Sequence, residues 1–285
     1  MSRSIRPADL PLAPPLRAGS FIVTLFGDVI APRGGDIWIG NIIAFCAPFG
    51  ISETLIRTAM SRLVAAGQVT GLRQGRRSFY RLTDAARQEY AQAARIIYGP
   101  PRNHDWRLVF LPHGDASAQI TSVPLPGHVA LSDHFTLGPA QGLLPADACA
   151  LSAPAEGNMQ AVRTMAQKCW PLDDLAQGYD AVLALTRQIA TLGRLPDAQA
   201  LEARVLLVHA FRAVALRDPA LPPEALPDDW AGERARRAFA EAYLGLSGAA
   251  DSHVAENFEA ADGPLPGLSA EGEDRIVQLR ACLKA

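Results

Sequence analysis

Cysteine is scarce in this 285-residue chain, and long hydrophobic runs are missing from it. The four cysteines include no CxxC pair, so the sequence supports neither a zinc site nor a disulfide framework. No stretch approaches the roughly eighteen consecutive apolar residues that a transmembrane helix needs. The proline-rich start lacks the apolar core of a signal peptide and predicts a disordered arm over residues 1–18. We therefore expect a cytoplasmic protein.

A net surplus of charge is also missing, because the formal net charge of the whole chain is only −2. This average hides an asymmetry between the two parts of the chain. Residues 1–100 hold 12 basic and 6 acidic side chains, a net charge of +6, and every basic one is an arginine. Residues 101–285 hold 15 and 23, a net charge of −8. A basic front and an acidic remainder indicate that the two parts do different work.

Hydrophobic periodicity in the basic part predicts three helices in succession. Apolar residues recur at helical spacing over residues 21–29 and again over residues 39–46. A turn at Gly50 then leads into a third helix, which opens at Ser52, a good N-cap residue, and ends before Gly67.

The third predicted helix carries different chemistry on its two faces. Its apolar stripe consists of Leu55, Ile56, Ala59, Met60, Leu63 and Val64. The opposite face holds two arginines and three hydroxyls, which are side chains that reach phosphates and base edges in nucleic acids: Thr54, Arg57, Thr58, Ser61 and Arg62. Because any solvated helix face can be polar, the helix alone does not decide between a binding surface and an ordinary exposed one.

The segment after this helix favours the binding interpretation. Two strand-like runs, Val69–Leu72 and Ser78–Leu82, flank a tip that holds Arg73, Arg76 and Arg77 and therefore predict a basic hairpin. Three helices followed by such a hairpin is the order of a winged helix-turn-helix. In that fold the third helix enters the major groove and the wing touches the neighbouring backbone or minor groove. We expect a winged-helix DNA-binding domain over residues 19–100, with a fourth helix that runs from Thr83 to Gly99.

The acidic part predicts a small middle domain and a helical C-terminal domain. Residues 106–112 read as a buried strand, and residues 113–158, rich in Pro, Gly, Ser and Ala, predict short strands and loops. From Met159 onward the pattern is mostly helical. The expected segments after the winged helix are thus a middle domain at 101–158 and a helical dimerisation and effector domain at 159–285. The predicted fold class is α+β, mostly helical.

Several short motifs of the chain are distinctive. At the front they are Thr24-Leu25-Phe26-Gly27-Asp28, Pro48-Phe49-Gly50-Ile51-Ser52 and Gly75-Arg76-Arg77-Ser78-Phe79-Tyr80-Arg81-Leu82-Thr83. Later ones are Trp170-Pro171-Leu172, Leu207-Val208-His209 and Leu226-Pro227-Asp228-Asp229-Trp230. Together these motifs resemble those of the PaaX-like family, the phenylacetic acid catabolism repressors of bacteria. The chain departs from the family pattern over residues 113–150, which contain almost no charged residues.

The resemblance implies a dimeric repressor with three parts: a winged helix, a middle α/β domain similar to the ferredoxin-like fold of Cas2, and a helical C-terminal domain. It also implies that an acyl-CoA such as phenylacetyl-CoA releases the protein from its operator. A dimer that reads two half-sites needs an inverted repeat in the double-stranded DNA. We expect no cofactor and no catalytic residue.

Two sets of site residues follow from these arguments. The first is expected to contact DNA and comprises Arg33, Thr54, Arg57, Thr58, Ser61, Arg62, Arg73, Arg76 and Arg77. The second is expected to line an acyl-CoA pocket between the C-terminal helices and comprises Trp170, Tyr179, His209 and Arg212. Aromatic and cationic side chains suit the acyl group and the phosphates, although such residues also serve as ordinary packing.

Two other classes of function remain open from the sequence. A Cas2-like nuclease needs an acidic metal ligand at the end of the first middle-domain strand. Here that strand ends in Leu111-Pro112-His113, which includes no acidic residue. No nucleophile–base constellation for acyl-CoA chemistry is visible, and His128, Asp133 and His134 are only a weak metal motif. A winged helix can also serve as a protein-interaction module, which predicts no sequence-selective DNA binding.

Overall fold

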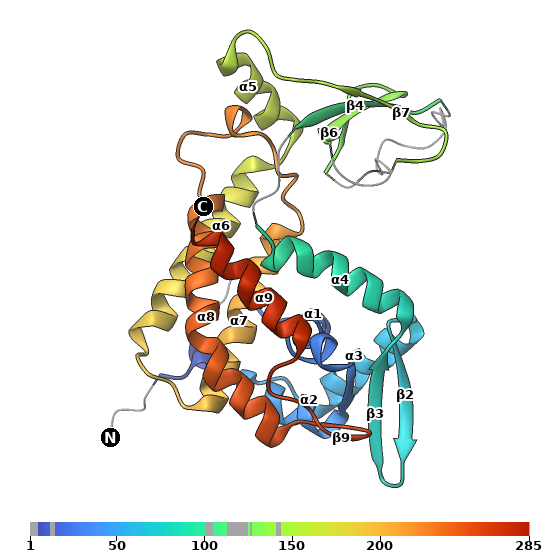
Figure 1. Ribbon diagram of the computed structural model, residues 1–285, viewed down its shortest axis with the longest axis vertical. Helices are drawn as coiled ribbons and strands as arrows, with labels where there is room; N and C mark the ends of the chain where they lie inside the picture. The colour runs from blue at the N-terminus through green and yellow to red at the C-terminus, as the bar shows by residue number, and fades with distance from the viewer. Residues whose placement is uncertain are drawn as a thin grey trace. The chain divides into compact units, whose positions relative to one another are not determined.

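The computed structural model describes residues 5–11, 15–100, 105–112, 125, 127–140 and 144–284 (Figure 1). Helices predominate in these residues and small antiparallel sheets accompany them, which confirms the predicted mostly helical α+β class. None of the described helices is both long and apolar enough to cross a membrane. The chain divides into two compact units: Met1–Pro100, Asp180–Leu216 and Arg234–Ala285 form the first, and Pro101–Tyr179 and Arg217–Glu233 form the second. The expected segment 159–285 therefore contributes to both units.

After the 3-10 turn η1 (Pro7–Asp9), the first unit continues with a helix of three successive types. Its next elements are α1 (Ala18–Leu25), the π-helical turn η2 (Phe26–Ile30), the 3-10 turn η3 (Ala31–Arg33), β1 (Asp36–Trp38), α2 (Ile39–Cys46), the 3-10 turn η4 (Ala47–Phe49) and α3 (Glu53–Ala65). The five apolar side chains that predicted the first helix are all fully buried: Phe21, Ile22, Leu25, Phe26 and Val29. The periodicity therefore identified the face of this helix that packs in the core.

Local turn chemistry sets the boundaries around α3. Gly50 has a φ of 71°, a left-handed conformation that glycine adopts without a steric penalty, and it redirects the chain between α2 and α3. The hydroxyl of Ser52 accepts a hydrogen bond from the Leu55 backbone N–H and caps α3. After α3, strands β2 (Val69–Gln74) and β3 (Arg77–Leu82) form the predicted hairpin.

The hairpin belongs to a three-stranded antiparallel sheet in the order β1-β3-β2. In the first unit it projects away from the helices (Figure 1). Helix α4 (Asp84–Tyr98) follows, and the Thr83 hydroxyl caps it by accepting a hydrogen bond from the Ala86 N–H at 3.2 Å. The predicted order of three helices followed by a hairpin is thus present in the first unit, with β1 between the first two helices.

C-terminal helices complete the first unit. They are the second half of α6 (Leu172–Thr191), α7 (Asp197–Ala215), α8 (Gly232–Asn257) and α9 (Ala270–Cys282), with the short hairpin β8 (Glu259–Ala260) and β9 (Gly263–Pro264) between the last two. Helix α7 is buried over most of its length and contacts α1 and α4. A single core therefore joins the N-terminal helices to helices that lie more than a hundred residues later.

The second unit contains a four-stranded sheet. Its strands are β4 (Trp106–Phe110), β5 (Val129–Ala130), β6 (Phe135–Pro139) and β7 (Cys149–Ser152), arranged in the order β5-β6-β4-β7 with every neighbour antiparallel. Helix α5 (Met159–Cys169) and the start of α6 follow. A ferredoxin-like sheet has the same strand order and directions. The described residues between β6 and β7 contain no helix, and residues 113–124, between β4 and β5, lie outside the described part.

Candidate nucleic-acid interface

The polar face of α3 points to solvent along its length. The five side chains predicted on this face are all exposed: Thr54, Arg57, Thr58, Ser61 and Arg62. Arg57 forms an exposed i,i+4 ion pair with Glu53 at 2.7 Å. Such surface pairs contribute at most about 1 kcal/mol, so this contact does not prevent the guanidinium from pairing with another anion. The face therefore offers two accessible cations flanked by hydroxyls.

The buried stripe of α3 is narrower than predicted. Ile56, Ala59 and Met60 are buried, but Leu55 and Val64 are 54% and 43% exposed. These two residues lie on opposite edges of the stripe, about 90° from its centre at 100° per residue, where the neighbouring elements no longer cover the helix. Leu55 and Val64 belong to the apolar stripe of the sequence but lie outside the core.

The three predicted arginines of the hairpin are exposed, but their surroundings differ. Arg73 donates to the Gly75 carbonyl at 3.3 Å across the turn. Arg77 lies over the ring of Trp38, with 4.6 Å between its guanidinium carbon and the ring centroid, and forms an ion pair with Glu259. Arg77 thus has an anionic partner from the C-terminal part of the same unit.

A short acidic hairpin presents that partner. Asn41 on α2 holds the start of β8, because its side chain donates to the Asn257 carbonyl at 2.7 Å and accepts from the Glu259 N–H at 2.9 Å. On the turn of this hairpin, Asp262 lies 3.9 Å from Arg81 of β3. Two carboxylates therefore stand beside β3, Glu259 at its start near the hairpin tip and Asp262 near its end.

Arg33 does not belong to this exposed surface. Its side chain is only 3% exposed, pairs with Asp251 of α8 at 2.7 Å, and donates to the carbonyls of Val29, Pro266 and Gly267. The prediction that Arg33 contacts DNA is therefore wrong, since a phosphate cannot reach a guanidinium whose donors are engaged inside the fold. The basic surface consists of α3 and the hairpin alone among the predicted sites.

The residues expected to line an effector pocket divide between the two units. In the second unit, Trp170 stacks on Trp106 with ring centroids 6.0 Å apart and donates to the Gly127 carbonyl at 3.0 Å. The Tyr179 hydroxyl donates to Asp218 at 2.5 Å, and both predicted aromatic side chains are buried. Both side chains therefore pack inside the second unit, and ligand contact by either of them stays a prediction.

In the first unit, His209 and Arg212 of α7 meet Thr24 of α1. The Thr24 hydroxyl lies 2.8 Å from Nδ1 of His209 and accepts from Arg212 at 3.0 Å. Burial, reinforced by repulsion from Arg212, lowers the pKa of His209 to about 4. His209 is therefore neutral near pH 7 and serves as a buried polar link between α1 and α7.

The low pKa of His209 is expected to make the first unit less stable as the pH falls from about 6.5 towards 4. In this window an unfolded histidine binds a proton and the folded one does not, so protons favour the unfolded chain. The effect is at most roughly 3 kcal/mol. Urea unfolding at about pH 7 and pH 4.5 should show a smaller pH dependence in His209→Gln. Equal pH dependence in both proteins would contradict the assignment.

The described histidines of the second unit form no metal site. His128 lies beside Arg107, with 3.4 Å between the two side-chain nitrogens, and Nδ1 of His134 is 3.1 Å from the Leu111 carbonyl oxygen. Nowhere in the described part of the chain do three or more His, Cys, Asp or Glu side chains gather as a metal site would need.

Comparisons with known proteins agree with the motifs of the sequence. Residues 17–86 match the family model described as PaaX-like protein, and residues 170–256 match that of the PaaX-like protein C-terminal domain. The transcriptional repressor PaaX of Escherichia coli (strain K12) is 30% identical over 279 residues, which span 89% of this chain and 88% of that protein. The chain belongs to the PaaX-like family.

A solved structure supports the fold of this PaaX-like chain. The uncharacterized protein Rv0674 from Mycobacterium tuberculosis superposes with a TM-score of 0.50 at 20% sequence identity. The match covers 82% of this chain and 97% of that one. At this identity the likeness concerns the fold alone.

Sequence reasoning missed the buried ionic network behind the interface of this PaaX-like chain. Asp28 of η2 is fully enclosed, accepts from Arg204 of α7 at 3.0 Å and accepts from the hydroxyls of Tyr98 and Tyr243 at 2.9 Å each. Burial alone would raise the pKa of Asp28, but Arg204, Arg275 and the two hydroxyls outweigh it and leave this pKa below its ordinary value. Asp28 therefore stays charged and ties η2 to α4, α7 and α8.

A second carboxylate extends this network to the segment that carries the misassigned arginine. Asp251 of α8 pairs with Arg204 at 2.6 Å and with Arg33 at 2.7 Å. The buried Asp28, the partly buried Asp251 and two buried arginines thus connect the N-terminal helices to the C-terminal ones. The network fixes the position of η2, which precedes α2 and α3 in the chain. None of the side chains in the network is itself exposed.

Proposed function

We propose that this PaaX-like protein is a DNA-binding transcriptional repressor without catalytic activity. In this proposal α3 enters the major groove of double-stranded DNA, and the β2–β3 hairpin contacts the adjacent backbone. The observation that carries the proposal is the joint exposure of Arg57 and Arg62 on α3 and of Arg73 and Arg76 on the hairpin. The name of the E. coli relative, a transcriptional repressor, supports the same function.

The polar face of α3 suggests how sequence would be read. Arginine can bind the edge of guanine in a bidentate manner, and the three hydroxyls can contact bases or phosphates. Leu55, exposed at the edge of the same face, suits an apolar contact with a thymine methyl group. The hairpin arginines would add phosphate contacts that hold the helix in register but carry no sequence information.

Operator selectivity in this proposal depends on a homodimer. One winged helix reads only a few base pairs, whereas two copies would read half-sites one helical turn, about 34–36 Å, or a multiple of it apart. A two-fold symmetric dimer requires an operator with inverted symmetry. The operator is therefore expected to be an inverted repeat.

Release from the operator is assigned to an acyl-CoA effector, with phenylacetyl-CoA as the first candidate from the family resemblance. The regulated genes would then serve the catabolism of an aromatic acid. A ligand releases a repressor when it favours a conformation that binds DNA less well. For a hundredfold change in operator occupancy, the ligand must bind the conformation with weak DNA affinity more tightly than the other by about 2.7 kcal/mol.

Titration of the protein against DNA from upstream of its own gene tests this function. We expect an inverted-repeat fragment to bind at least about a thousandfold more tightly than a scrambled fragment of equal length, and phenylacetyl-CoA to weaken that binding. Equal binding to both fragments would contradict the repressor function and favour a protein-interaction module. Selective DNA binding that phenylacetyl-CoA does not change would contradict only the proposed effector and would leave the repressor function intact.

Neutralising Glu259 is expected to tighten DNA binding. Glu259→Gln frees Arg77 from its ion pair, and one additional phosphate contact should steepen the dependence of log K on log salt by about 0.9. Because the pair is half exposed, the gain in affinity should be up to about fivefold at moderate salt.

The matched control for this experiment is Glu256→Gln, which removes the same charge from the exposed end of α8. Fluorescence anisotropy titrations at several salt concentrations measure both quantities. An equal gain in the two variants would show that only net charge matters, which would contradict a specific competition for Arg77.

A further inference from the structure

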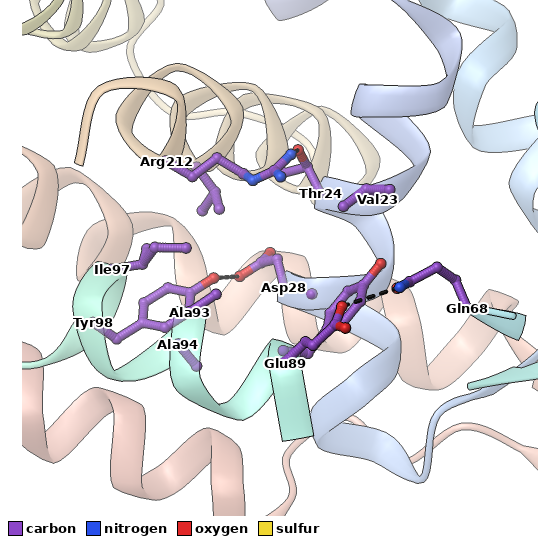
Figure 2. Close-up of a pocket in the computed structure, with 13 residues that line it drawn as sticks. Val23, Thr24, Asp28, Gln68, Glu89, Ala93, Ala94, Ile97, Tyr98 and Arg212 are labelled. Atoms are coloured by element: carbon purple, nitrogen blue, oxygen red, sulfur yellow. Dashed lines mark hydrogen bonds between the residues drawn. The ribbon is translucent and has the colours of Figure 1, made fainter. Parts of the chain in front are cut away.

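A cavity of about 180 Å³ lies within the first unit, among α1, η2, α4 and α7. Its apolar wall consists of Val23, Gly27, Ala93, Ala94, Ile97 and Val208. Figure 2 shows Arg212 and Thr24 on one side of the cavity and Glu89 and Gln68 on another. One turn of its wall is the π-helical turn η2, a rare conformation that is frequent at functional sites.

Arg212 supplies a cation to this wall. Its Nη1 donates to the Ser20 carbonyl at 3.1 Å and to the Thr24 hydroxyl at 3.0 Å, and these are its hydrogen bonds within the described residues. No carboxylate in the described part of the chain forms an ion pair with it. Burial lowers the pKa of Arg212, which reflects the cost of holding an unpaired charge away from water.

The two acidic residues of the cavity wall do not compensate Arg212. Asp28 already binds Arg204 and the hydroxyls of Tyr98 and Tyr243. Glu89 is exposed and accepts a hydrogen bond from Gln68 at 3.0 Å. The uncompensated charge of the cavity is therefore positive, and it lies against a largely apolar wall.

The size of the cavity limits what it can hold. An apolar protein cavity of about 150 Å³ accommodates benzene. A cavity of 180 Å³ therefore has room for one aromatic ring and a few further atoms. A carboxylate is the anion that an arginine binds with two parallel hydrogen bonds in a space of this size.

We propose that this cavity binds a monocarboxylate whose apolar body is about as large as one aromatic ring. The carboxylate pairs with Arg212, and the apolar body contacts Ala94 and Ile97 of α4 and Val208 of α7. Gln68, which joins α3 to β2, forms part of the same wall, so the ligand lies directly behind this connection. The proposal goes beyond the repressor function and does not depend on it, since a chain that bound no DNA could still bind the acid.

Calorimetry on the full-length protein tests this proposal with benzoate, phenylacetate and 3-phenylpropanoate, each compared with its uncharged primary amide. We expect saturable one-to-one binding of at least one acid and at least tenfold weaker binding of its amide. Arg212→Gln keeps a donor for Thr24 but loses the charge, and it should weaken binding of the acid at least tenfold. Ala94→Leu fills the cavity and should abolish binding.

The matched control is Ala91→Leu, which adds the same side chain to an exposed position of α4 outside the cavity wall and should bind like the unmodified protein. Thermal unfolding of each variant checks that the fold is retained. Equal binding of acid and amide, unchanged binding by Ala94→Leu, or no binding of any acid by the unmodified protein would overturn the proposal. Binding of phenylacetyl-CoA without binding of any free acid would also overturn it and would leave the repressor function intact.

Discussion

Asp28→Ala is expected to lower the free energy of unfolding by about 3–5 kcal/mol or to prevent folding of the first unit. The substitution leaves the Arg204 guanidinium fully buried without its 3.0 Å partner, and it also removes the acceptor of two buried tyrosine hydroxyls. Removing one member of a buried ion pair costs about this much. Arg204 keeps its 2.6 Å pair with Asp251, but Asp251 also pairs with Arg33, so two buried arginines then share one carboxylate. A domain with a typical total stability of about 5–15 kcal/mol has little left after such a loss.

Urea unfolding of Asp28→Ala and Asp28→Asn measures this effect. The asparagine variant keeps an acceptor for one hydroxyl but loses the charge, so we expect a loss intermediate between those of alanine and the unmodified chain. Asp180→Ala, at an exposed position of α6, is the matched control and should change the stability by less than about 0.5 kcal/mol. A loss below about 1 kcal/mol in Asp28→Ala would contradict the role assigned to the buried network.

Arg57→Ala combined with Arg62→Ala is expected to abolish selective binding to the operator while leaving the fold intact. A specific arginine contact is worth about 1–3 kcal/mol, so loss of two should weaken operator binding by at least about thirtyfold. Both side chains are exposed, and the ion pair of Arg57 with Glu53 is a surface pair, so stability should change little.

The salt dependence of binding separates two roles for these arginines. If both contact phosphates, the slope of log K against log salt should fall by about 1.8, and binding to all sequences should weaken alike. If the two arginines read bases, the affinity for the operator should fall much more than the affinity for other DNA sequences. Arg187→Ala combined with Arg280→Ala removes the same charge from exposed positions on α6 and α9 and is the control. An equal loss in the control would show that net charge, rather than α3, determines binding.

The architecture around α3 could be predicted because its signals are local. Helical spacing identified the buried faces, and the caps Ser52 and Thr83 and the turn glycines Gly50 and Gly75 marked the boundaries. Each of these signals acts within a few residues, so it can be read from the sequence without knowledge of the fold. The predicted polar face of α3 is exposed for the same reason.

Contacts between distant segments could not be predicted in the same way. The sequence places Arg33 in a glycine-rich turn beside the predicted DNA-binding helices, whereas Asp251, 218 residues later, holds it in the core. The partner of Arg77 is 182 residues away, in β8. No local pattern specifies such pairs.

One signal for the buried network was nevertheless present in the sequence. Asp28 follows Phe21 by seven residues and Leu25 by three, which places it on the apolar face of the first helix. Arg204 similarly follows Leu201 by three residues and precedes Val208 by four. An acid and a base that each interrupt an apolar stripe indicate a buried ion pair, since buried charges are usually paired.

The central claim is that α3 and the β2–β3 hairpin recognise a specific DNA sequence. The most direct measurement is the ratio of affinities for the inverted-repeat operator and a scrambled fragment, obtained by anisotropy titration of the unmodified protein and of the Arg57→Ala, Arg62→Ala variant. We expect a ratio of at least about a thousand for the unmodified protein and a ratio near one for the variant. A ratio near one for both proteins, or a ratio unchanged by the substitutions, would contradict the claim.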